Sequence, residues 1–149
     1  MEEKQSSLIF QDSNLFYPEK EKEVSDIVKK FYKSNTPIEI IGSGSKRRIG
    51  KPLQCEKTLS LSKLEGIKEY HPEELYITVK AGTKIDKIEN ELRKNKQQLA
   101  FEPIDFGYLY KGKSDCGTAA GQVACNISGP RRFKVGSTRD HILGFRAVN

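Results

Sequence analysis

The stretch GTAAGQVACNISGPRRFKVGSTRD, residues 117–140, decides how the rest of the chain is interpreted. Small residues dominate its first half, so the backbone can approach a ligand closely and offer N–H groups to oxygen atoms. Two arginines, a glycine–serine pair and Arg139-Asp140 follow. This order suits a cofactor that carries phosphates and a large planar ring, although the composition also fits an irregular glycine-rich loop with a solvated basic tail.

The composition bounds the class of protein. The 149 residues amount to about one domain, and 36% hydrophobic with 31% charged residues is within the globular range. No apolar run is long enough to span a membrane, and the first residues lack a signal-peptide pattern, which predicts a cytoplasmic protein without an integral membrane segment. Cys55, Cys116 and Cys125 form no C-x-x-C pair, so we expect reduced thiols and no metal site.

A formal net charge of +6 suggests an anionic partner. Basic residues gather at 46–51 and at 131–134. A nucleic-acid surface usually interleaves such residues with exposed aromatic side chains, and only Phe133 lies close enough to serve. We therefore expect no nucleic-acid partner, and a noncatalytic module that binds RNA or another polyanion stays the alternative.

The spacing of apolar residues predicts an α+β or α/β arrangement. A helix over 21–34 is indicated by apolar residues on one face: Val24, Ile27, Val28, Phe31 and Tyr32. A second helix follows Thr83, which with Asp86 has the spacing of a capping box, and it ends near Asn95. We expect strands at 38–41, 66–70 and 75–80.

The first of these strands runs directly into Gly42-Ser43-Gly44-Ser45-Lys46. Glycines permit positive φ, so consecutive N–H groups can converge on one anionic oxygen, and the hydroxyls and the lysine add donors and charge. A plain surface turn is equally compatible with this segment. It lacks the third glycine of a Rossmann fingerprint.

Residues 107–114, GYLYKGKS, match the P-loop pattern G-x-x-x-x-G-K-S letter for letter. A P-loop follows a buried strand and opens a helix, whereas this segment follows Glu102-Pro103-Ile104-Asp105. We therefore interpret it as a surface loop rather than the mark of a nucleoside triphosphatase.

Taken in order, these motifs resemble the FAD-binding domain of the vanillyl-alcohol oxidase (PCMH-type) superfamily, and in particular the FAD-binding subunits of bacterial glycolate oxidases. The matching segments are 41–46, 70–83, 117–121, 128–132, 136–140 and 142–144. The resemblance implies an α+β, PCMH-type FAD-binding domain over residues 16–149, preceded by an N-terminal arm at 1–15. The domain is expected to be incomplete at its C-terminus, with the substrate and cap region absent.

The resemblance also implies the cofactor site. The FAD pyrophosphate is expected on the backbone of residues 42–46, and the flavin and ribityl chain near the later motifs. The implied cofactor-binding residues are Gly42, Ser43, Gly44, Ser45, Lys46, Gly117, Thr118, Gly121, Gly136, Ser137, Arg139 and Asp140. Serine replaces the histidine that tethers FAD in some relatives, so noncovalent FAD is expected. Ala120 stands where the family commonly has a glycine.

The implied activity is oxidation of a small 2-hydroxy acid, glycolate to glyoxylate, by hydride transfer to FAD. An FAD-dependent dehydrogenase of D-lactate or another hydroxy acid is the alternative within the family. The implied partners are other glycolate oxidase subunits, including an iron–sulfur subunit, with a cytoplasmic location or one at the periphery of the inner membrane through those subunits. No catalytic residue can be assigned.

Overall fold

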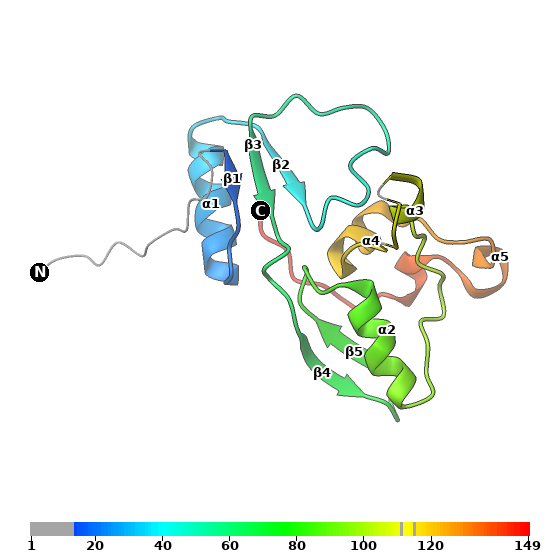
Figure 1. The fold of residues 1–149 in the computed structure, drawn as a ribbon. Helices are drawn as coiled ribbons and strands as arrows, with labels where there is room; N and C mark the ends of the chain where they lie inside the picture. Colours follow the sequence, from blue (N-terminus) through cyan, green and yellow to red (C-terminus); the bar gives the residue numbers. More distant parts are fainter. Residues whose placement is uncertain (1–13, 111, 115) are drawn as a thin grey trace, which may run out of the picture.

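The computed structural model describes residues 14–110, 112–114 and 116–149. Two small sheets carry helices on their faces (Figure 1). One is parallel, in the order β1 (Leu15–Phe16), β3 (Lys57–Ser60), β2 (Ile38–Ile41). The other is an antiparallel pair of β4 (Ile67–His71) and β5 (Tyr76–Val79). The mixed α+β architecture expected from the sequence is therefore confirmed. The predicted arm falls mostly on residues 1–13, which lie outside the described residues.

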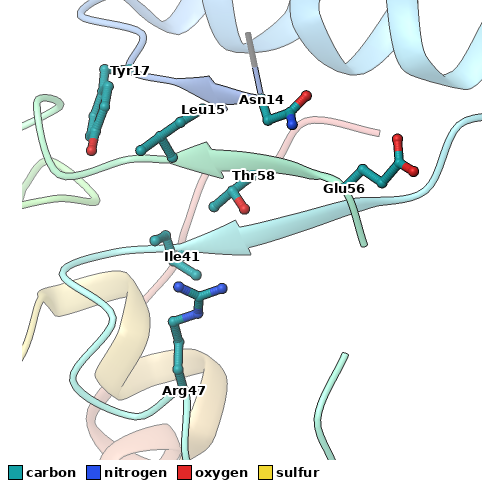
Figure 2. Close-up of a pocket in the computed structure, with 7 residues that line it drawn as sticks. All are labelled: Asn14, Leu15, Tyr17, Ile41, Arg47, Glu56 and Thr58. Carbon is teal, nitrogen blue, oxygen red and sulfur yellow. The ribbon is translucent and has the colours of Figure 1, made fainter. Parts of the chain in front are cut away.

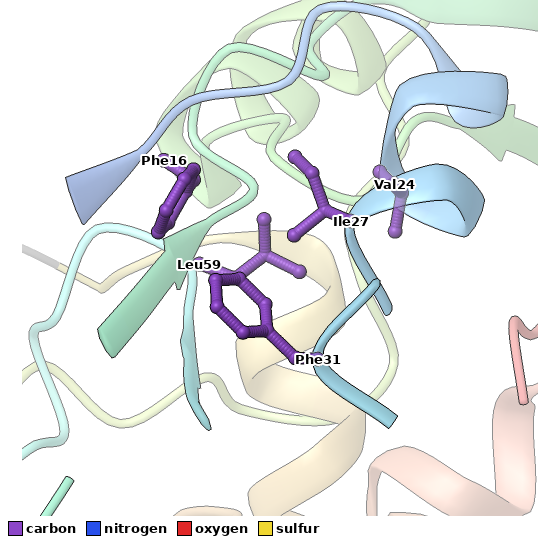
Figure 3. Packing of buried hydrophobic residues seen from close by; sticks show 5 residues of the cluster. All are labelled: Phe16, Val24, Ile27, Phe31 and Leu59. Carbon is purple, nitrogen blue, oxygen red and sulfur yellow. The ribbon is translucent and has the colours of Figure 1, made fainter. Parts of the chain in front are cut away.

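Helix α1 (Glu21–Lys33) covers one face of the parallel sheet. Its buried side chains meet two strand residues in one cluster, shown in Figure 3: Phe16, Val24, Ile27, Phe31 and Leu59. Asn35 follows the helix with a φ of 50°, the left-handed conformation that ends helices. The predicted helix is confirmed, but Tyr32 does not belong to its apolar face. It is 85% exposed, because a step of one residue after Phe31 rotates it about 100° away from the core.

Strand β3 is the central strand of the parallel sheet, and the sequence did not reveal it. Its four residues, KTLS, include three polar ones and give no clear strand signal. Pairing with β1 on one side and β2 on the other buries Leu59 to 1% exposure. The strand is therefore defined by its neighbours in space rather than by its local sequence.

Helix α2 (Ile85–Lys94) packs Ile85, Ile88 and Leu92 on the β4–β5 pair. The predicted capping box at its start is wrong, because Lys84 is the N-cap residue and no side chain caps the helix. The Thr83 hydroxyl, fully buried, instead accepts from the Gly66 N–H and donates to the Gly66 carbonyl, both at 3.0 Å. Thr83 thus ties the start of the hairpin to the turn before α2.

The two sheets meet at a tight junction around Gly82. The Gly82 N–H donates to the Leu64 carbonyl at 2.7 Å, just beyond the end of β3. A Cβ atom on Gly82 would lie 2.1 Å from the Leu61 carbonyl oxygen and 2.9 Å from that of Ser62. Only glycine therefore fits where the two halves come together.

The remaining residues form short helices: α3 (Gly107–Tyr110), α4 (Ala119–Cys125), α5 (Arg132–Val135) and the 3₁₀ helix η1 (Thr138–His141). α3 lies inside the P-loop-like segment, where a true P-loop would have a glycine-rich loop whose backbone N–H groups cradle the phosphates. Near the C-terminus the chain returns to the parallel sheet, where Val148 packs against the α1 cluster and Arg146 pairs with Glu21 at 2.8 Å (Figure 1).

Candidate functional site

The turn predicted to bind phosphate, residues 42–46, follows β2 directly. Gly44 has a φ of 72°, a conformation that glycine adopts without strain. Within the described part of the chain, no acceptor takes the backbone N–H of Gly44 or of Ser45. Two successive N–H groups beside a left-handed glycine form a concave binding place for an anionic oxygen.

The second glycine motif, residues 117–121, lies directly against this turn. A Cβ atom on Gly42 would lie 2.1 Å from the Thr118 Oγ1 atom, and one on Gly117 would lie 2.5 Å from the Ser45 Oγ atom. The Lys46 Nζ atom donates to the carbonyl of Cys116 at 2.9 Å, across 70 residues of sequence. The structure therefore brings the 42–46 turn and the 117–121 motif into direct contact.

The N–H groups at the start of α4 are already bonded within the protein. The Ala119 N–H donates to the Thr83 carbonyl at 2.8 Å, and the Ala120 N–H to the Ala81 carbonyl at 3.0 Å. The Gly121 N–H donates to the Thr118 hydroxyl, the N-cap of the helix, at 3.4 Å. The donors that remain for an anion therefore come from the 42–46 turn, while Thr118, 1% exposed, supports the turn from behind.

The third motif, residues 136–140, forms a small structure of its own. Gly136 has a φ of 86°, and the Asp140 carboxylate then accepts from the Ser137 N–H at 2.7 Å and from the Ser137 hydroxyl at 2.8 Å. This arrangement caps η1. The Arg139 side chain is 76% exposed and lies 3.7 Å from Asp140. Asp140 thus orders the motif, while Arg139 presents its charge at the surface.

Asp140 gives this motif a dependence on pH. Hydrogen bonds from the Ser137 N–H, then from its hydroxyl, lower the pKa of Asp140. A carboxyl with a lowered folded pKa stabilises the fold above its unfolded pKa, and this contribution is lost as the pH falls through the folded value. Asp140→Asn should therefore lose less stability than the wild type between neutral pH and about pH 3, measured by urea unfolding. Identical pH dependence in the two proteins would contradict this.

Three buried polar residues connect the second and third motifs through contacts that the sequence did not reveal. The Gln122 Nε2 atom donates to the Ile127 carbonyl and to the Thr138 hydroxyl, the latter at 3.1 Å. The Ser128 hydroxyl accepts from the Thr138 N–H at 3.1 Å. Among the described residues the Gln122 Oε1 atom is buried without a partner. The signal available in the sequence was the position of Gln122, one turn after Thr118, which places both side chains on one face of α4.

An open cavity of about 430 Å³ lies on the parallel sheet, on the face opposite α1 (Figure 2). Alternation along the strands places Leu15 and Thr58 on this face, because Phe16 and Leu59 point toward α1. Its lining residues are Asn14, Leu15, Tyr17, Ile41, Arg47, Glu56 and Thr58. None of these is a predicted cofactor residue, so the cavity and the predicted site are neighbours and not the same place.

Cys116, the cysteine beside the turn, has a thiol that is not readily ionised. Burial, with a further contribution from Asp105, raises the pKa of the Cys116 thiol to about 11, so it is protonated at neutral pH.

Within the residues that the structure describes, no three histidine, cysteine, aspartate or glutamate side chains are grouped to hold a metal ion. No helix in that same part of the chain has the length and apolar character needed to cross a membrane.

The residues at the turn fit a diphosphate. A diphosphate requires converging donors, positive charge and close approach of the backbone. The N–H groups of Gly44 and Ser45 would supply the donors, and Lys46 would supply a charge held in place by its bond to Cys116. The two motifs approach so closely that a Cβ atom fits neither at position 42 nor at position 117, and both residues are glycine.

Known proteins are similar to this chain in sequence and in fold. The sequence profile of the FAD binding domain family matches residues 13–149. Glycolate oxidase subunit GlcE of Escherichia coli (strain K12) is 40% identical over 113 residues, which are 76% of this chain and 30% of that protein. Two solved structures of alkyldihydroxyacetonephosphate synthase are 23% identical, with TM-scores of 0.70 and 0.71. They cover 90% of this chain, and the match spans 26% and 24% of their own length.

This chain therefore spans less than a third of the length of each of these relatives. The likeness to the two synthase structures concerns the fold. The match to the family profile includes every residue of the turn, of the second glycine motif and of the third motif, and it confirms the cofactor and fold expected from the sequence. The chain belongs to the FAD binding domain family.

Proposed function

We propose that this chain is the FAD-binding part of an oxidoreductase that oxidises a small 2-hydroxy acid, with glycolate as the substrate and glyoxylate as the product. The observation that supports it most is the meeting of the 42–46 turn with residues 116–118 around two N–H groups that lack an acceptor in the described structure. The glycolate oxidase subunit, 40% identical over 113 residues, supports the choice of substrate.

The residues of the turn would hold the cofactor without a covalent bond. The N–H groups of Gly44 and Ser45 would bind phosphate oxygens, and Lys46 would offset their charge. The Gly117 backbone and Thr118 would close the turn from the other side, and Gly121, Gly136, Ser137 and Arg139 would contact the flavin and its ribityl chain. The chemistry that FAD supplies is acceptance of a hydride from the hydroxyl-bearing carbon of the substrate. Residues 42–46 contain no histidine, so this turn offers no histidine to which FAD could be tethered.

A flavin titration with two glycine variants tests the site. Gly44 and Gly50 both have positive φ, 72° and 86°, so valine at either position introduces similar backbone strain. Gly44→Val should weaken FAD binding by about tenfold or more, because it distorts the turn that carries the donors. Gly50→Val should leave the affinity unchanged, because nothing lies within 4 Å of its Cβ position.

Quenching of FAD fluorescence gives the affinity, and circular dichroism shows that each variant is folded. Saturable binding to the wild type with a loss confined to Gly44→Val supports the proposal. Equal losses in the two variants would remove the turn from the site. Salt-sensitive binding of RNA without any flavin would favour the polyanion module, which the family match does not support.

The substrate and the partners are tested with the assembled enzyme. We propose that residues 16–149 act with other glycolate oxidase subunits, an iron–sulfur subunit among them, in the cytoplasm or at the inner membrane through those subunits. Reduction of a dye by the purified assembly with glycolate, and not with D-lactate, supports this assignment. Preference for D-lactate would support the alternative hydroxy-acid dehydrogenase.

A further inference from the structure

We infer that Glu39 and Arg47 form a clasp that holds the 42–46 turn in its binding shape, so that Arg47 is a positioning residue rather than a ligand of the phosphates. The role toward the cofactor rests on the proposed function. The clasp itself rests on the geometry around β2. An arginine directly after a phosphate-binding turn would ordinarily be taken for a ligand, and its contacts argue against that.

The pair has two parallel hydrogen bonds. The Arg47 Nε atom lies 2.8 Å from Glu39 Oε1, and its Nη2 atom lies 2.5 Å from Glu39 Oε2. The Thr58 hydroxyl on β3 donates to the same carboxylate at 3.3 Å. Glu39 is only 8% exposed although it is charged. Such fork-to-fork pairs fix orientation as well as charge.

The clasp closes the chain around the turn. Arg47 follows the turn and Glu39 lies within β2 before it, so their contact joins the two ends. The Arg47 N–H donates to the Gly44 carbonyl at 3.3 Å, and the Arg47 Cδ atom would lie 3.4 Å from a Cβ atom on Gly44. Figure 2 shows the Arg47 side chain directed back toward Ile41 and Thr58 on the sheet.

A phosphate could recruit Arg47 only by breaking this pair. The Glu39 carboxylate would then stay buried with Thr58 as its remaining described partner, which is strongly unfavourable for a charge. The positive charge near the phosphates therefore comes from Lys46, whose ammonium group bonds to Cys116 on the opposite motif. Arg47 therefore maintains the conformation of the 42–46 turn, and Lys46 supplies the positive charge beside the phosphates.

The test measures FAD affinity in Glu39→Gln, Arg47→Met and the double variant. If the two residues act as one clasp, each single variant should weaken FAD binding by about tenfold, and the double variant should lose no more than either. If Arg47 were a ligand, Arg47→Met would lose affinity while Glu39→Gln would keep or gain it, because the arginine would be released toward the phosphates. That second result would overturn the inference.

A surface pair provides the matched control. Glu89 and Arg93 on α2 form an ion pair at 3.8 Å. The variants Glu89→Gln and Arg93→Met remove the same charges as Glu39→Gln and Arg47→Met do. Those variants should bind FAD as the wild type does. If they weaken binding as much as the clasp variants do, only net charge is involved and the inference is wrong.

Proteolysis tests the clasp without the cofactor. Trypsin can cut after Lys46, Arg47 and Arg48, and Glu39→Gln leaves all three sites in place. Cutting there should be about tenfold faster in Glu39→Gln than in Glu89→Gln, because the turn opens more often. Equal rates would overturn the clasp. A wild type that binds no FAD would instead overturn the proposed function and the role of the clasp toward the cofactor, whatever the trypsin rates.

Discussion

Gly82→Ala should destabilise the protein by about 3 kcal/mol or more, the largest effect on stability expected from a single methyl group in this fold. The new Cβ atom would lie 2.1 Å from the Leu61 carbonyl oxygen and 2.9 Å from that of Ser62. Both obstacles are backbone atoms just beyond the end of β3, so no side-chain rotation relieves the overlap. The measurement is the free energy of unfolding in urea, followed by circular dichroism.

Gly144→Ala is the matched control for this change. No heavy atom lies within 4 Å of its Cβ position, and its φ is outside the left-handed region. Its unfolding free energy should stay within about 0.5 kcal/mol of the wild type. If Gly82→Ala unfolds at the same urea concentration as Gly144→Ala, the junction between the two sheets is looser than the structure shows.

Gly42→Ala should have the largest effect on the cofactor, weakening FAD binding by about a hundredfold while the protein stays folded. Its Cβ atom would lie 2.1 Å from the Thr118 Oγ1 atom and 3.1 Å from two carbons of the same side chain. Thr118 must then turn away and give up its hydrogen bond to the Gly121 N–H. The two motifs separate, and the fold loses about 1–3 kcal/mol. Fluorescence titration with FAD measures the affinity.

A second change distinguishes this separation from general damage. Thr118→Gly removes the three atoms nearest to the new methyl group, at a cost of a few tenths of a kcal/mol to about 1 kcal/mol for the lost N-cap. In the double variant Gly42→Ala/Thr118→Gly, FAD affinity should therefore recover by about tenfold relative to Gly42→Ala. A double variant that binds FAD no better than Gly42→Ala would show that the contact between the motifs does not control the affinity.

The sequence predicted those elements whose signals are local. Helix α1 follows from the spacing of Val24, Ile27 and Phe31, and each of these is buried in the structure. Strand β3 has no comparable signal, because only pairing on both sides makes the segment KTLS a strand. The capping box failed for a related reason, since the hydroxyl of Thr83 found a partner at Gly66, 17 residues earlier in the chain.

The candidate site shows the same division between local and long-range information. The glycines of the 42–46 turn and their family resemblance located the place where donors converge, although the contact of each residue with FAD stays a prediction. The sequence could not show that the N–H groups of Ala119 and Ala120 would be bonded to the carbonyls of Thr83 and Ala81. That result depends on how residues 81–85 lie beside 117–120, which the pattern within either segment does not encode.

The bond between Lys46 and Cys116 has a consequence for the stability of the folded chain. These residues are 70 positions apart, with the β4–β5 hairpin and α2 between them in sequence, so the turn and its opposite motif meet only in the folded arrangement. A ligand that recognises only this closed arrangement stabilises the folded state and not the unfolded chain. At a concentration of FAD one hundred times its Kd, this stabilisation would amount to about 2.7 kcal/mol.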